Sequence, residues 1–598
     1  MRPLAGAIAI TIAVTFVAIS SRPILPIDET RYVSVAWEGY VTGDLLVSHK
    51  NGETYAHKPP LLFWLINASW WLFGVSEWAA RIVAPFAGVL CLPLVRWIAK
   101  TLWPEDIDTA NFAPCILASF SVWLLFAPLT MFDTLLTLSA LVSICGLLHA
   151  MSGRAVFGWL VAGIGMGIGI LTKGPVIFVH ILPVAMLGYW LFRDRKQIAS
   201  NDSTLFSNSK LNSSRSIELR QWSISHWYLG VLASILVAGS IGLSWAIPSA
   251  IAGGKEYGDE LLWGQTAGRV ATSFSHRHPF YWYVPILPIC LLPWLFLGTL
   301  WRGIRKIEMD WAIKMLAVWI AGPLLILSLI SGKQVHYLMP MFPAFALFFA
   351  KALSQVRQSV PARDVAVLAV GTGLIGCLPL AFNSVPKLEE LGLAGIVPNL
   401  FVPVLILEAL AICFVCQRTI HRVVFGLSAF SAASISIIVG AAGINFWGSF
   451  SVDGIANYVT ESKVPVVWYG EYHAQLNFAG RMKPIDWAMT ADELQDWMGN
   501  HDGGIVVTRL TGGEDVALWN QFLATQDSQM SSHPTEEQQR LLKSILAQRL
   551  EFSALAQPPE TKAIYWVRMG LNKKPYVAMC VHSDGNPSHV AGSAEILR

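Results

Sequence analysis

Residues suited to catalysis are concentrated in the stretch 22–60, which lies between a first apolar segment and a long run of membrane-type sequence. The charged and aromatic residues of this stretch that we expect beside the lipid headgroups are Asp28, Glu29, Arg31, Tyr32, Tyr55, His57 and Lys58. Charged side chains beside lipid headgroups allow a polar site to meet a lipid-borne substrate while its chemistry stays out of hydrocarbon. This composition predicts an active site at the membrane surface.

The residue types suit transfer of a sugar from a lipid phosphate to an acceptor. Such a transfer needs cations that neutralise the phosphate leaving group, a carboxylate that orients or deprotonates the acceptor, and a site that excludes water. The cations that we expect to contribute are Lys58, Lys173, Arg269 and Lys333. Asp28 is the carboxylate that we expect to act on the acceptor, and proton transfer by such a group typically contributes ~10²–10⁴-fold to the rate.

The composition identifies the chain as a polytopic α-helical membrane protein. Of its 598 residues 54% are hydrophobic and only 14% are charged, against roughly 25% charged residues in soluble domains. The net charge is +3 and the basic residues are scattered in short loops, so we expect a lipid bilayer as partner and no nucleic acid. The 8 cysteines lie almost entirely in apolar segments and predict neither a disulfide framework nor a metal cluster.

Apolar windows of about 18 to 22 residues predict about thirteen transmembrane helices. They lie near 4–20, 80–102, 110–129, 133–151, 155–172, 174–192, 227–250, 281–300, 311–330, 337–356, 364–383, 398–416 and 423–447. The basic loops between them fall on one side, which is then cytoplasmic. The segment 61–76 is apolar but would invert this pattern if it spanned, so we expect it to lie along the outer interface.

This topology places unusual polar residues of distant segments on the outer side. Besides the first loop, they are Asp133, Lys173, the loop 251–280, Lys333, His336 and Tyr337. We therefore expect them to converge on one extracytoplasmic cavity. Simpler interpretations exist for single residues: Asp133 could be a helix-end residue, and Lys173 could end a span with its ammonium at the interface.

The tail after about residue 450 differs in character from the rest. Short β-rich runs at 465–468, 504–508, 563–567 and 576–581 alternate with helical patterns, two of which open with capping boxes, at Thr490 and Thr535. We therefore expect two domains: a transmembrane catalytic domain over 1–450, in which 22–80 form the first outer loop with interfacial helices, and a soluble α/β domain over 451–598.

The motifs PIDETRYVSVAWEGY, YAHKPP, MFDTLLTL, LTKGP and SGKQVHYLMP resemble those of bacterial lipid-linked sugar transferases with the GT-C fold. This group includes the lipid A aminoarabinose transferases and is related to the protein O-mannosyltransferases. The resemblance covers roughly residues 1 to 350 well. It implies a polyprenyl phosphate sugar donor, most often undecaprenyl phosphate, a lipid or glycan acceptor, inversion at the anomeric carbon, and a bacterial inner membrane with the active site and the tail facing the periplasm.

The resemblance also implies roles for single residues. Asp28 matches the catalytic carboxylate, with Arg31 and Tyr32 beside it, and Asp133 matches a second acid. Tyr55 and Lys58 resemble carrier-phosphate contacts of the family, and further residues that match its motifs are Lys173, Arg269 and Tyr337. Lys333 is a candidate for substrate binding through its charge alone. Lipid A would be the acceptor and 4-amino-4-deoxy-L-arabinose the sugar if the aminoarabinose branch is the relevant one.

The chain departs from that branch at its metal site. Aminoarabinose transferases have a glutamate before the KPP lysine and an acid and a histidine in the large outer loop, whereas this chain has His57, Gln265 and Thr266. Zinc generally takes three or four protein ligands. We therefore predict no metal and no other cofactor, although His57 with His276 or His278 would be the candidates for a different metal site.

Two other function classes stay open. A lipid or sugar transporter or flippase would be expected to have matching halves with broken helices and ionisable residues near the membrane midplane. A scaffold or sensor that binds through its soluble tail would leave the charged first loop unexplained. Within the enzyme hypothesis, a phosphate acceptor would need Asp28 for orientation, and a hydroxyl acceptor would need it as a base.

Overall fold

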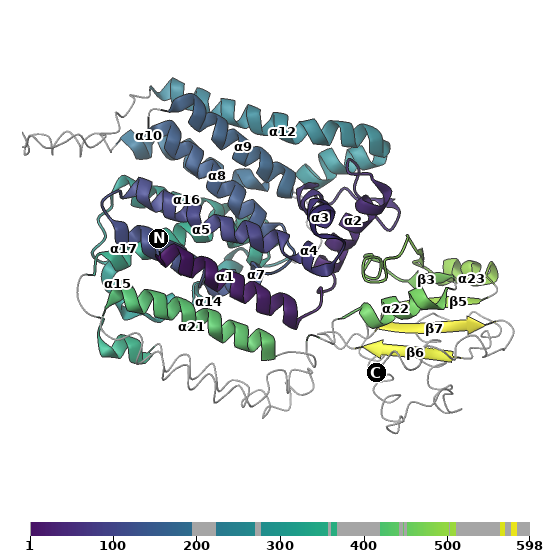
Figure 1. The fold of residues 1–598 in the computed structure, drawn as a ribbon. Helices are drawn as coiled ribbons and strands as arrows, with labels where there is room; N and C mark the ends of the chain where they lie inside the picture. The colour runs from purple at the N-terminus through teal and green to yellow at the C-terminus, as the bar shows by residue number, and fades with distance from the viewer. Residues whose placement is uncertain are drawn as a thin grey trace, which may run out of the picture.

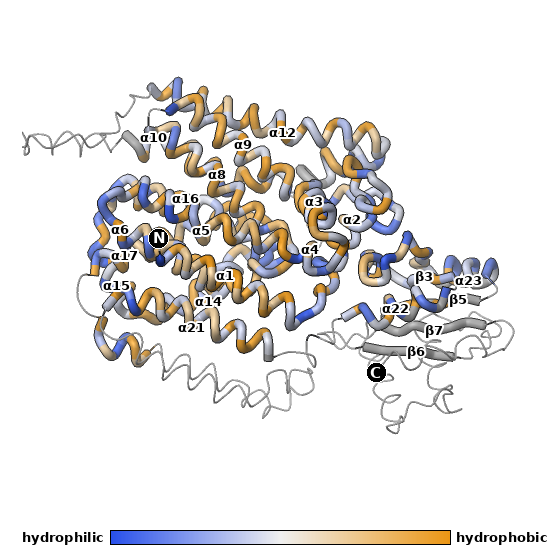
Figure 2. Tube along the Cα trace, viewed as in Figure 1, coloured by the Kyte–Doolittle hydropathy of each residue, from blue (hydrophilic) through white to orange (hydrophobic). Residues whose placement is uncertain are grey.

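The computed structural model describes residues 2–152, 154–193, 223–268, 277–356, 360–367, 419–441, 447, 451–463, 465–501, 503–509, 563–568 and 576–582. Within these ranges, eight helical segments are long and apolar enough to cross a membrane. They form one bundle, and the soluble part lies beyond one of its ends (Figure 1). Figure 2 shows apolar residues along the helices of this bundle and more hydrophilic ones toward its ends. The predicted polytopic helical fold is confirmed.

The long helices of the bundle follow the predicted apolar windows closely. They are α1 (Arg2–Ser21), α5 (Val83–Leu102), α8 (Asp133–Met151), α9 (Ala155–Lys173), α10 (Ile177–Arg193), α12 (Ile224–Asp259), α16 (Trp311–Leu329), α17 (Phe342–Ser354) and α21 (Ile420–Ala441). Short helical segments join two pairs of them, η1 (Gly174–Val176) between α9 and α10 and η5 (Val335–Met341) between α16 and α17, and η2 (Glu260–Gly268) directly follows α12. The predicted spans 364–383 and 398–416 lie outside the described residues except for 364–367, so the predicted count stays a prediction.

Two predicted spans are broken into shorter helices. The window 110–129 contains α6 (Ile107–Leu117) and α7 (Ser121–Phe126), and the window 281–300 contains η3 (Phe280–Trp282), α14 (Tyr283–Cys290), η4 (Trp294–Phe296) and the start of α15 (Gly298–Ile304). In the second window Pro293 lacks the N–H that would continue a helix. Apolarity predicted one continuous span for each of these windows, but it carried no information about where the helices break.

Small residues bring α8 and α9 close together. A Cβ added at Gly146 would lie 2.3 Å from the backbone nitrogen of Ala162, and one added at Gly158 would lie 2.1 Å from that of Ala150. Close helix contacts of this kind are typical of membrane interiors, where packing rather than hydrophobicity drives association. Because α8 and α9 form a tight antiparallel hairpin, the first residue of α8 and the last residue of α9 lie at the same end of the bundle.

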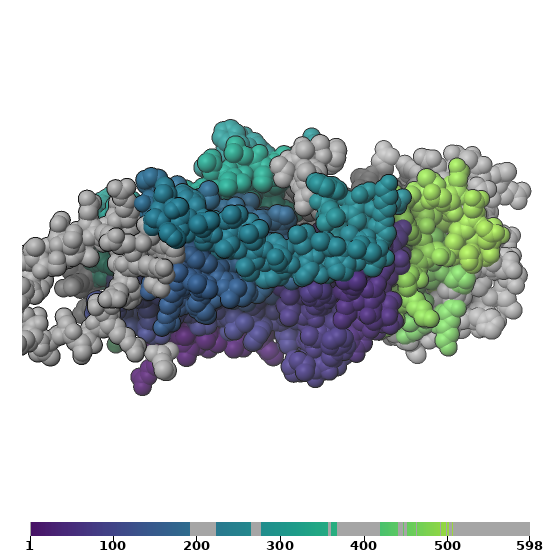
Figure 3. All heavy atoms as spheres, turned by 90° about the horizontal axis from the view of Figure 1, so that it is seen from above, coloured from purple at the N-terminus to yellow at the C-terminus, as the bar shows by residue number. Residues whose placement is uncertain are grey.

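The first outer loop forms a small cap between the bundle and the soluble part (Figures 1 and 3). It contains α2 (Asp28–Thr42), the two-stranded hairpin of β1 (His49–Lys50) and β2 (Glu53–Thr54), α3 (Leu61–Phe73) and α4 (Glu77–Arg81). The predicted helix in 61–76 is thus α3. Its thirteen residues are too few to span a bilayer unaided, and its last residues, Trp71, Leu72 and Phe73, are exposed.

The soluble part is an α/β structure, as predicted. Its sheet has the order β4-β3-β5-β7-β6, in which β3 pairs in parallel with β4 and β5, and β7 pairs antiparallel with β5 and β6. The elements are α22 (Asp453–Ser462), β3 (Val466–Tyr469), β4 (Asp486–Ala488), α23 (Ala491–Gly499), β5 (Gly503–Arg509), β6 (Ala563–Arg568) and β7 (Tyr576–His582). The capping box at Thr490 is present, whereas Thr535 lies outside the described residues.

Candidate active site

The hairpin of α8 and α9 brings an acid and a cation together. The Nζ of Lys173 lies 2.6 Å from the Oδ1 of Asp133. The carboxyl side chain is only 3% exposed. A charge in such surroundings is expensive unless it is paired, so each of these groups compensates the buried charge of the other. The two residues that the sequence placed on the outer side therefore form one ion pair.

A third segment completes this pair. The Nε2 of His336 lies 3.9 Å from the Oδ2 of Asp133, and the Nζ of Lys173 lies 4.5 Å from the centre of the Tyr337 ring. The second contact has the geometry of a cation–π interaction. Both residues belong to η5, which lies between α16 and α17. The sequence pointed to Tyr337 as a binding residue, but it gave His336 no role of its own.

Asp28 begins α2 in the cap, where the helix N-terminus favours negative charge. Its Oδ1 accepts hydrogen bonds from Arg31, one turn along the helix, and from the Tyr32 hydroxyl at 3.3 Å. Burial, together with the charge of Asp28, raises the pKa of Tyr32 well above its usual value, so the phenol stays protonated and donates. The Asp28 side chain itself is 44% exposed. The three predicted residues of the DETRY motif thus act as a unit around an accessible carboxylate.

Phe132 connects the two acids and Lys58. The Tyr32 ring meets Phe132 edge-on, with 4.9 Å between the ring centres, and the Nζ of Lys58 lies 5.8 Å from the centre of the Phe132 ring. Phe132 directly precedes Asp133 in the chain. The charges of Asp28 and Lys58 both act on His336. The first loop and the helix hairpin therefore meet in one region of the molecule.

Tyr55 and His57 of the first loop lie beside η2, another outer segment. The Tyr55 ring stacks on the ring of His57, with 5.3 Å between their centres, and the His57 Nε2 lies 3.2 Å from the Oε1 of Glu260 at the start of η2. His278 stacks on Trp282. Among the described residues no three His, Cys, Asp or Glu side chains gather into a possible metal site. Arg269 and His276 lie outside the described residues.

Lys333 differs from the other predicted cations in its surroundings. It is buried, and its Nζ donates hydrogen bonds to the backbone carbonyls of His278, at 3.0 Å, and of Ile330. The backbone of the same two segments is joined at Arg277 and Gly332 by an isolated β-bridge. These contacts give the ammonium a role in holding two outer segments together, and its role in substrate binding stays a prediction.

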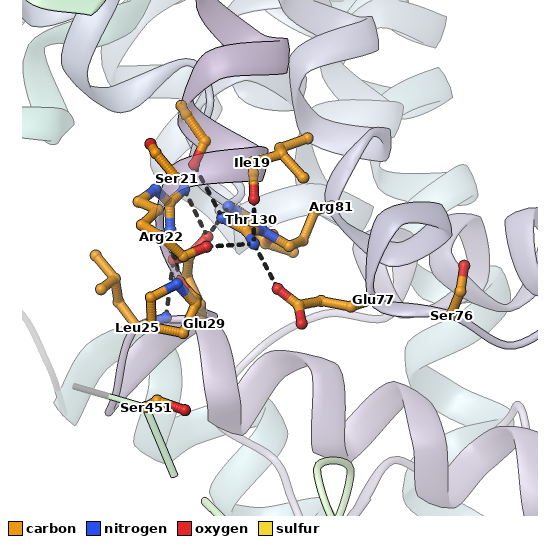
Figure 4. Close-up of polar contacts among 12 residues, drawn as sticks. Ile19, Ser21, Arg22, Leu25, Glu29, Ser76, Glu77, Arg81, Thr130 and Ser451 are labelled. Atoms are coloured by element: carbon orange, nitrogen blue, oxygen red, sulfur yellow. Dashed lines mark hydrogen bonds and ion pairs between the residues drawn. The ribbon is translucent and has the colours of Figure 1, made fainter. Parts of the chain in front are cut away.

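Glu29, the neighbour of Asp28, has a structural role that sequence reasoning did not assign (Figure 4). It is buried, pairs with Arg22, and accepts hydrogen bonds from the backbone nitrogens of Leu25 at 3.1 Å and Thr130 at 2.6 Å. Burial alone would raise the pKa of Glu29, but the guanidinium groups of Arg22 and Arg81 and these donors hold it below its usual value. Glu29 therefore joins the start of α2 to the turn before α8.

Arg81 ties this cluster to α1. Its guanidinium is buried, donates to the backbone carbonyls of Ile19 and Arg22 at 3.1 and 2.8 Å, and pairs with Glu77 (Figure 4). Because Glu29 and Arg81 anchor the segments that lead into α2 and α8, they fix the positions of Asp28 and Asp133 relative to each other. A signal for Glu29 existed in the sequence, since adjacent acids in one helical turn cannot face the same way.

Comparisons with known proteins agree with this architecture. Residues 57–206 match the family model of dolichyl-phosphate-mannose-protein mannosyltransferase. Proteins named undecaprenyl phosphate-alpha-4-amino-4-deoxy-L-arabinose arabinosyl transferase are 26% identical over 395 residues in Serratia proteamaculans, covering 63% of this chain and 65% of the relative, and 30% identical over 395 residues in Pectobacterium carotovorum, covering 63% and 62%. The match thus spans less than two thirds of the length of these relatives.

A solved structure extends the comparison to the whole fold. The crystal structure of ArnT from Cupriavidus metallidurans bound to undecaprenyl phosphate superposes with a TM-score of 0.67 at 17% sequence identity, covering 96% of this chain and 97% of that one. The apo structure of the same protein gives a TM-score of 0.66. The resemblance that the motifs indicated is confirmed: the chain has the GT-C fold and resembles the lipid-linked sugar glycosyltransferases of the aminoarabinose transferase and protein mannosyltransferase type.

Proposed function

We propose that the protein is a membrane glycosyltransferase that moves a sugar from undecaprenyl phosphate to an extracytoplasmic acceptor. The observation that carries this proposal is the meeting of Asp28 and Lys58 of the first loop with the Asp133–Lys173 pair at one end of the bundle. The names of the relatives support 4-amino-4-deoxy-L-arabinose as the sugar and a lipid A-type glycolipid as the acceptor. The site and the soluble domain then face the periplasm of a bacterial inner membrane.

The transfer makes one bond and breaks one. An acceptor oxygen attacks the anomeric carbon of the sugar, the bond between that carbon and the carrier phosphate oxygen breaks, and its electron pair leaves with undecaprenyl phosphate. Inversion at the anomeric carbon follows from attack opposite the leaving group. The protein has to stabilise negative charge that grows on the phosphate and to hold the acceptor oxygen in line.

In this proposal Asp28 acts on the acceptor. Its carboxylate is accessible, and Arg31 and Tyr32 hold it through hydrogen bonds to Oδ1. A phosphate monoester acceptor has a second pKa of about 6 and is largely ionised near neutrality, so Asp28 would then orient it. With a hydroxyl acceptor, Asp28 would remove the proton.

The cations act on the carrier phosphate. Lys58 lies over Phe132, and Lys173 lies between Asp133 and Tyr337. We assign Asp133 the task of keeping Lys173 charged and in place, and we assign Tyr55 and Tyr337 contacts with the carrier. Arg269 is a further proposed phosphate contact, and Lys333 a weaker candidate because backbone carbonyls already occupy its ammonium.

A transporter or flippase is the competing proposal, and the positions of the ionisable residues disfavour it. Asp133 is the first residue of α8 and Lys173 the last of α9, so both lie at helix ends. A transport site is expected near the membrane midplane, on broken helices of matching halves. Transport of a lipid-linked sugar without cleavage of its glycosidic bond would nevertheless support this competitor.

The test is a transfer assay with the purified full chain in detergent. Labelled undecaprenyl phosphate-aminoarabinose is incubated with lipid A, and the products are separated by mass. The proposal predicts free undecaprenyl phosphate and lipid A that carries the label, with the exposed, matched control Asp492→Asn unchanged. A strong loss in Asp28→Asn would indicate a base role toward a hydroxyl acceptor, and a small loss would indicate orientation of a phosphate acceptor. An intact donor after prolonged incubation with wild-type protein and with other glycolipid or protein acceptors would contradict the proposal.

A further inference from the structure

The soluble domain contacts the first loop through the tip of the hairpin formed by β1 and β2. The side chain of Asn51 at this tip is 7% exposed, although the hairpin lies on the outer side of the bundle. Its Nδ2 donates to the backbone carbonyl of Ile485 at 2.8 Å, and its Oδ1 accepts from the backbone nitrogen of Ile485 at 2.9 Å and from the Nδ2 of Asn477 at 3.0 Å. One amide thus makes three hydrogen bonds to the soluble domain.

The geometry of Asn51 follows from the turn and from its partners. Asn51 and Gly52 connect the paired residues Lys50 and Glu53, and both have positive φ, of 55° and 84°. This is the pattern of a two-residue hairpin turn in which Asn-Gly is strongly preferred. On the partner side, the Asn477 Oδ1 accepts a hydrogen bond from Tyr472, which fixes the orientation of the Asn477 amide. The turn therefore requires only a residue that adopts a positive φ at position 51, whereas the hydrogen bonds to the soluble domain require the side-chain amide of Asn51.

The hairpin links the contact at Asn51 to the residues of the candidate site. The backbone nitrogen of Gly52 donates to Glu38 of α2 at 2.7 Å, and that of Tyr55 donates to the carbonyl of Ser48 at 2.7 Å. Tyr55 follows β2 directly and opens the segment 55–58, which carries the proposed carrier contacts Tyr55 and Lys58. A shift of the hairpin therefore shifts this segment.

A second contact holds α2 itself. The ring of Phe478 stacks on Trp70 of α3, with 5.3 Å between ring centres and 10° between ring planes, and its backbone nitrogen donates to Ser34 of α2 at 3.2 Å. The Nε1 of Trp37, also on α2, donates to the carbonyl of Met482 at 3.2 Å. The soluble domain thus contacts both α2, which begins at Asp28, and the hairpin, which precedes the segment that contains Lys58.

We propose that the soluble domain positions the carrier-binding segment 55–58 and that Asn51 is the positioning residue through which it does so. The role of that segment rests on the proposed function, whereas the positioning itself does not. Removal of the Asn51 amide should release the hairpin tip from Ile485 and Asn477 of the soluble domain, while α2 stays held through Ser34 and Trp37 and the Gly52–Glu38 hydrogen bond remains. Loss of carrier affinity is then expected without an equal loss in the rate of the bound complex.

The decisive variant is Asn51→Gly, because glycine keeps the positive φ that the turn requires and removes only the amide. Asn51→Asp is the conservative variant, since its carboxylate can still accept from Ile485 and Asn477. Asn500→Gly, at the exposed end of α23 in the soluble domain, is the matched Asn-to-Gly control. All variants are made in the full chain in detergent.

Two readouts separate this inference from the proposed function. Hydrogen exchange of residues 53–58 should become about tenfold faster in Asn51→Gly, as expected for loss of buried hydrogen bonds, with no change in α8 and α9. Binding of undecaprenyl phosphate should weaken about tenfold, and the donor KM should rise while kcat stays within about twofold. Asn51→Asp should be intermediate and Asn500→Gly should equal the wild type.

Unchanged exchange at 53–58 in Asn51→Gly would overturn the inference, and so would acceleration throughout α8 and α9, because the effect would then be one on the whole fold. Failure of the wild type to bind undecaprenyl phosphate would instead contradict the proposed function. The exchange measurement would still decide whether Asn51 positions the segment.

Discussion

Asp28 and Asp133 are two carboxylates of one site with opposite surroundings. Asp28 is 44% exposed and Asp133 is 3% exposed, yet each pairs with a cation. An exposed pair contributes little to stability because solvent screens it, whereas removal of one partner from a buried pair leaves an uncompensated charge. In the proposed function this difference separates two tasks, in which Asp28 meets a substrate and Asp133 holds Lys173 in place. Substitutions at the two positions should therefore affect different quantities.

The largest effect on activity is expected at Asp28. Asp28→Asn keeps the size of the side chain and removes its charge, so a hydroxyl acceptor would lose its base and the transfer rate should fall by ~10²–10⁴-fold. The thermal stability should stay close to that of the wild type, because the carboxylate is accessible. The initial rate of transfer measures the effect on activity, and the Tm in detergent measures the effect on stability. A rate near that of the wild type would exclude a base role and leave orientation of an ionised phosphate.

The largest effect on stability is expected at the buried pair. Lys173→Met should leave the Asp133 carboxylate uncompensated and destabilise the protein by about 3–5 kcal/mol. The double variant Lys173→Met with Asp133→Asn should recover part of this loss, since no buried charge then remains. Thermal unfolding followed by tryptophan fluorescence provides the comparison. Equal stability of the single variant and the wild type would show that Asp133 is not held as an ion.

Glu29 sharpens the comparison because it is adjacent to Asp28 but buried like Asp133. Glu29→Gln should lower stability by about 1–3 kcal/mol through loss of charged hydrogen bonds. Against the effect of burial, Arg22, Arg81 and its hydrogen-bond donors hold the pKa of Glu29 below its usual value in the folded protein, so the unfolded chain binds its proton first as pH falls. The contribution of Glu29 to stability is therefore present above the usual pKa range of a glutamate and is lost as pH falls through the lower folded pKa.

The corresponding measurement is the Tm as a function of pH in both proteins. The wild type should lose stability below pH 4.5 more steeply than Glu29→Gln, which has no carboxyl group at this position. Parallel curves would mean that Glu29 is not stabilised as an anion in the folded state.

The smallest effect is expected from a comparison of two lysines. Lys58→Met should weaken undecaprenyl phosphate binding about tenfold, the size expected for one charged contact. Lys333→Met should affect this affinity less, because the Lys333 ammonium is occupied by the carbonyls of His278 and Ile330. Isothermal or fluorescence titration with the lipid distinguishes the two. A stronger loss in Lys333→Met than in Lys58→Met would reverse the assignment.

Sequence reasoning succeeded where a residue's place follows from the topology of the helices. Asp133 and Lys173 lie at the ends of adjacent apolar windows, so alternation of the spans was enough to put them on one side. The same holds for the η5 residue Tyr337. Four strands of the soluble sheet, β3, β5, β6 and β7, were also predictable, because they are short apolar runs between turns, whereas β4 was not predicted.

Sequence reasoning failed where the outcome depends on packing between distant segments. The burial of Glu29 depends on Arg22 and on the turn at Thr130, and no local pattern indicates either contact. The Lys333 ammonium is held by a carbonyl 55 residues away in the chain. The Asn51-Gly52 pair indicates a turn in the sequence, but the hydrogen bonds of the Asn51 amide to the soluble domain become visible only in the folded structure. The breaks within 110–129 and 281–300 were missed for a different reason, because apolarity alone does not indicate where a helix ends, and Pro293 was not used as a helix breaker.

The account depends on one arrangement, in which the first loop and the helix hairpin bind the same carrier phosphate. A cryo-electron microscopy map of the full chain with undecaprenyl phosphate tests it directly. We predict density for the phosphate within hydrogen-bond distance of Lys58, on the side of the Asp133–Lys173 pair and facing the Asp28 carboxylate. Phosphate density bound elsewhere, with Lys58 and Asp28 directed away from it, would contradict the account.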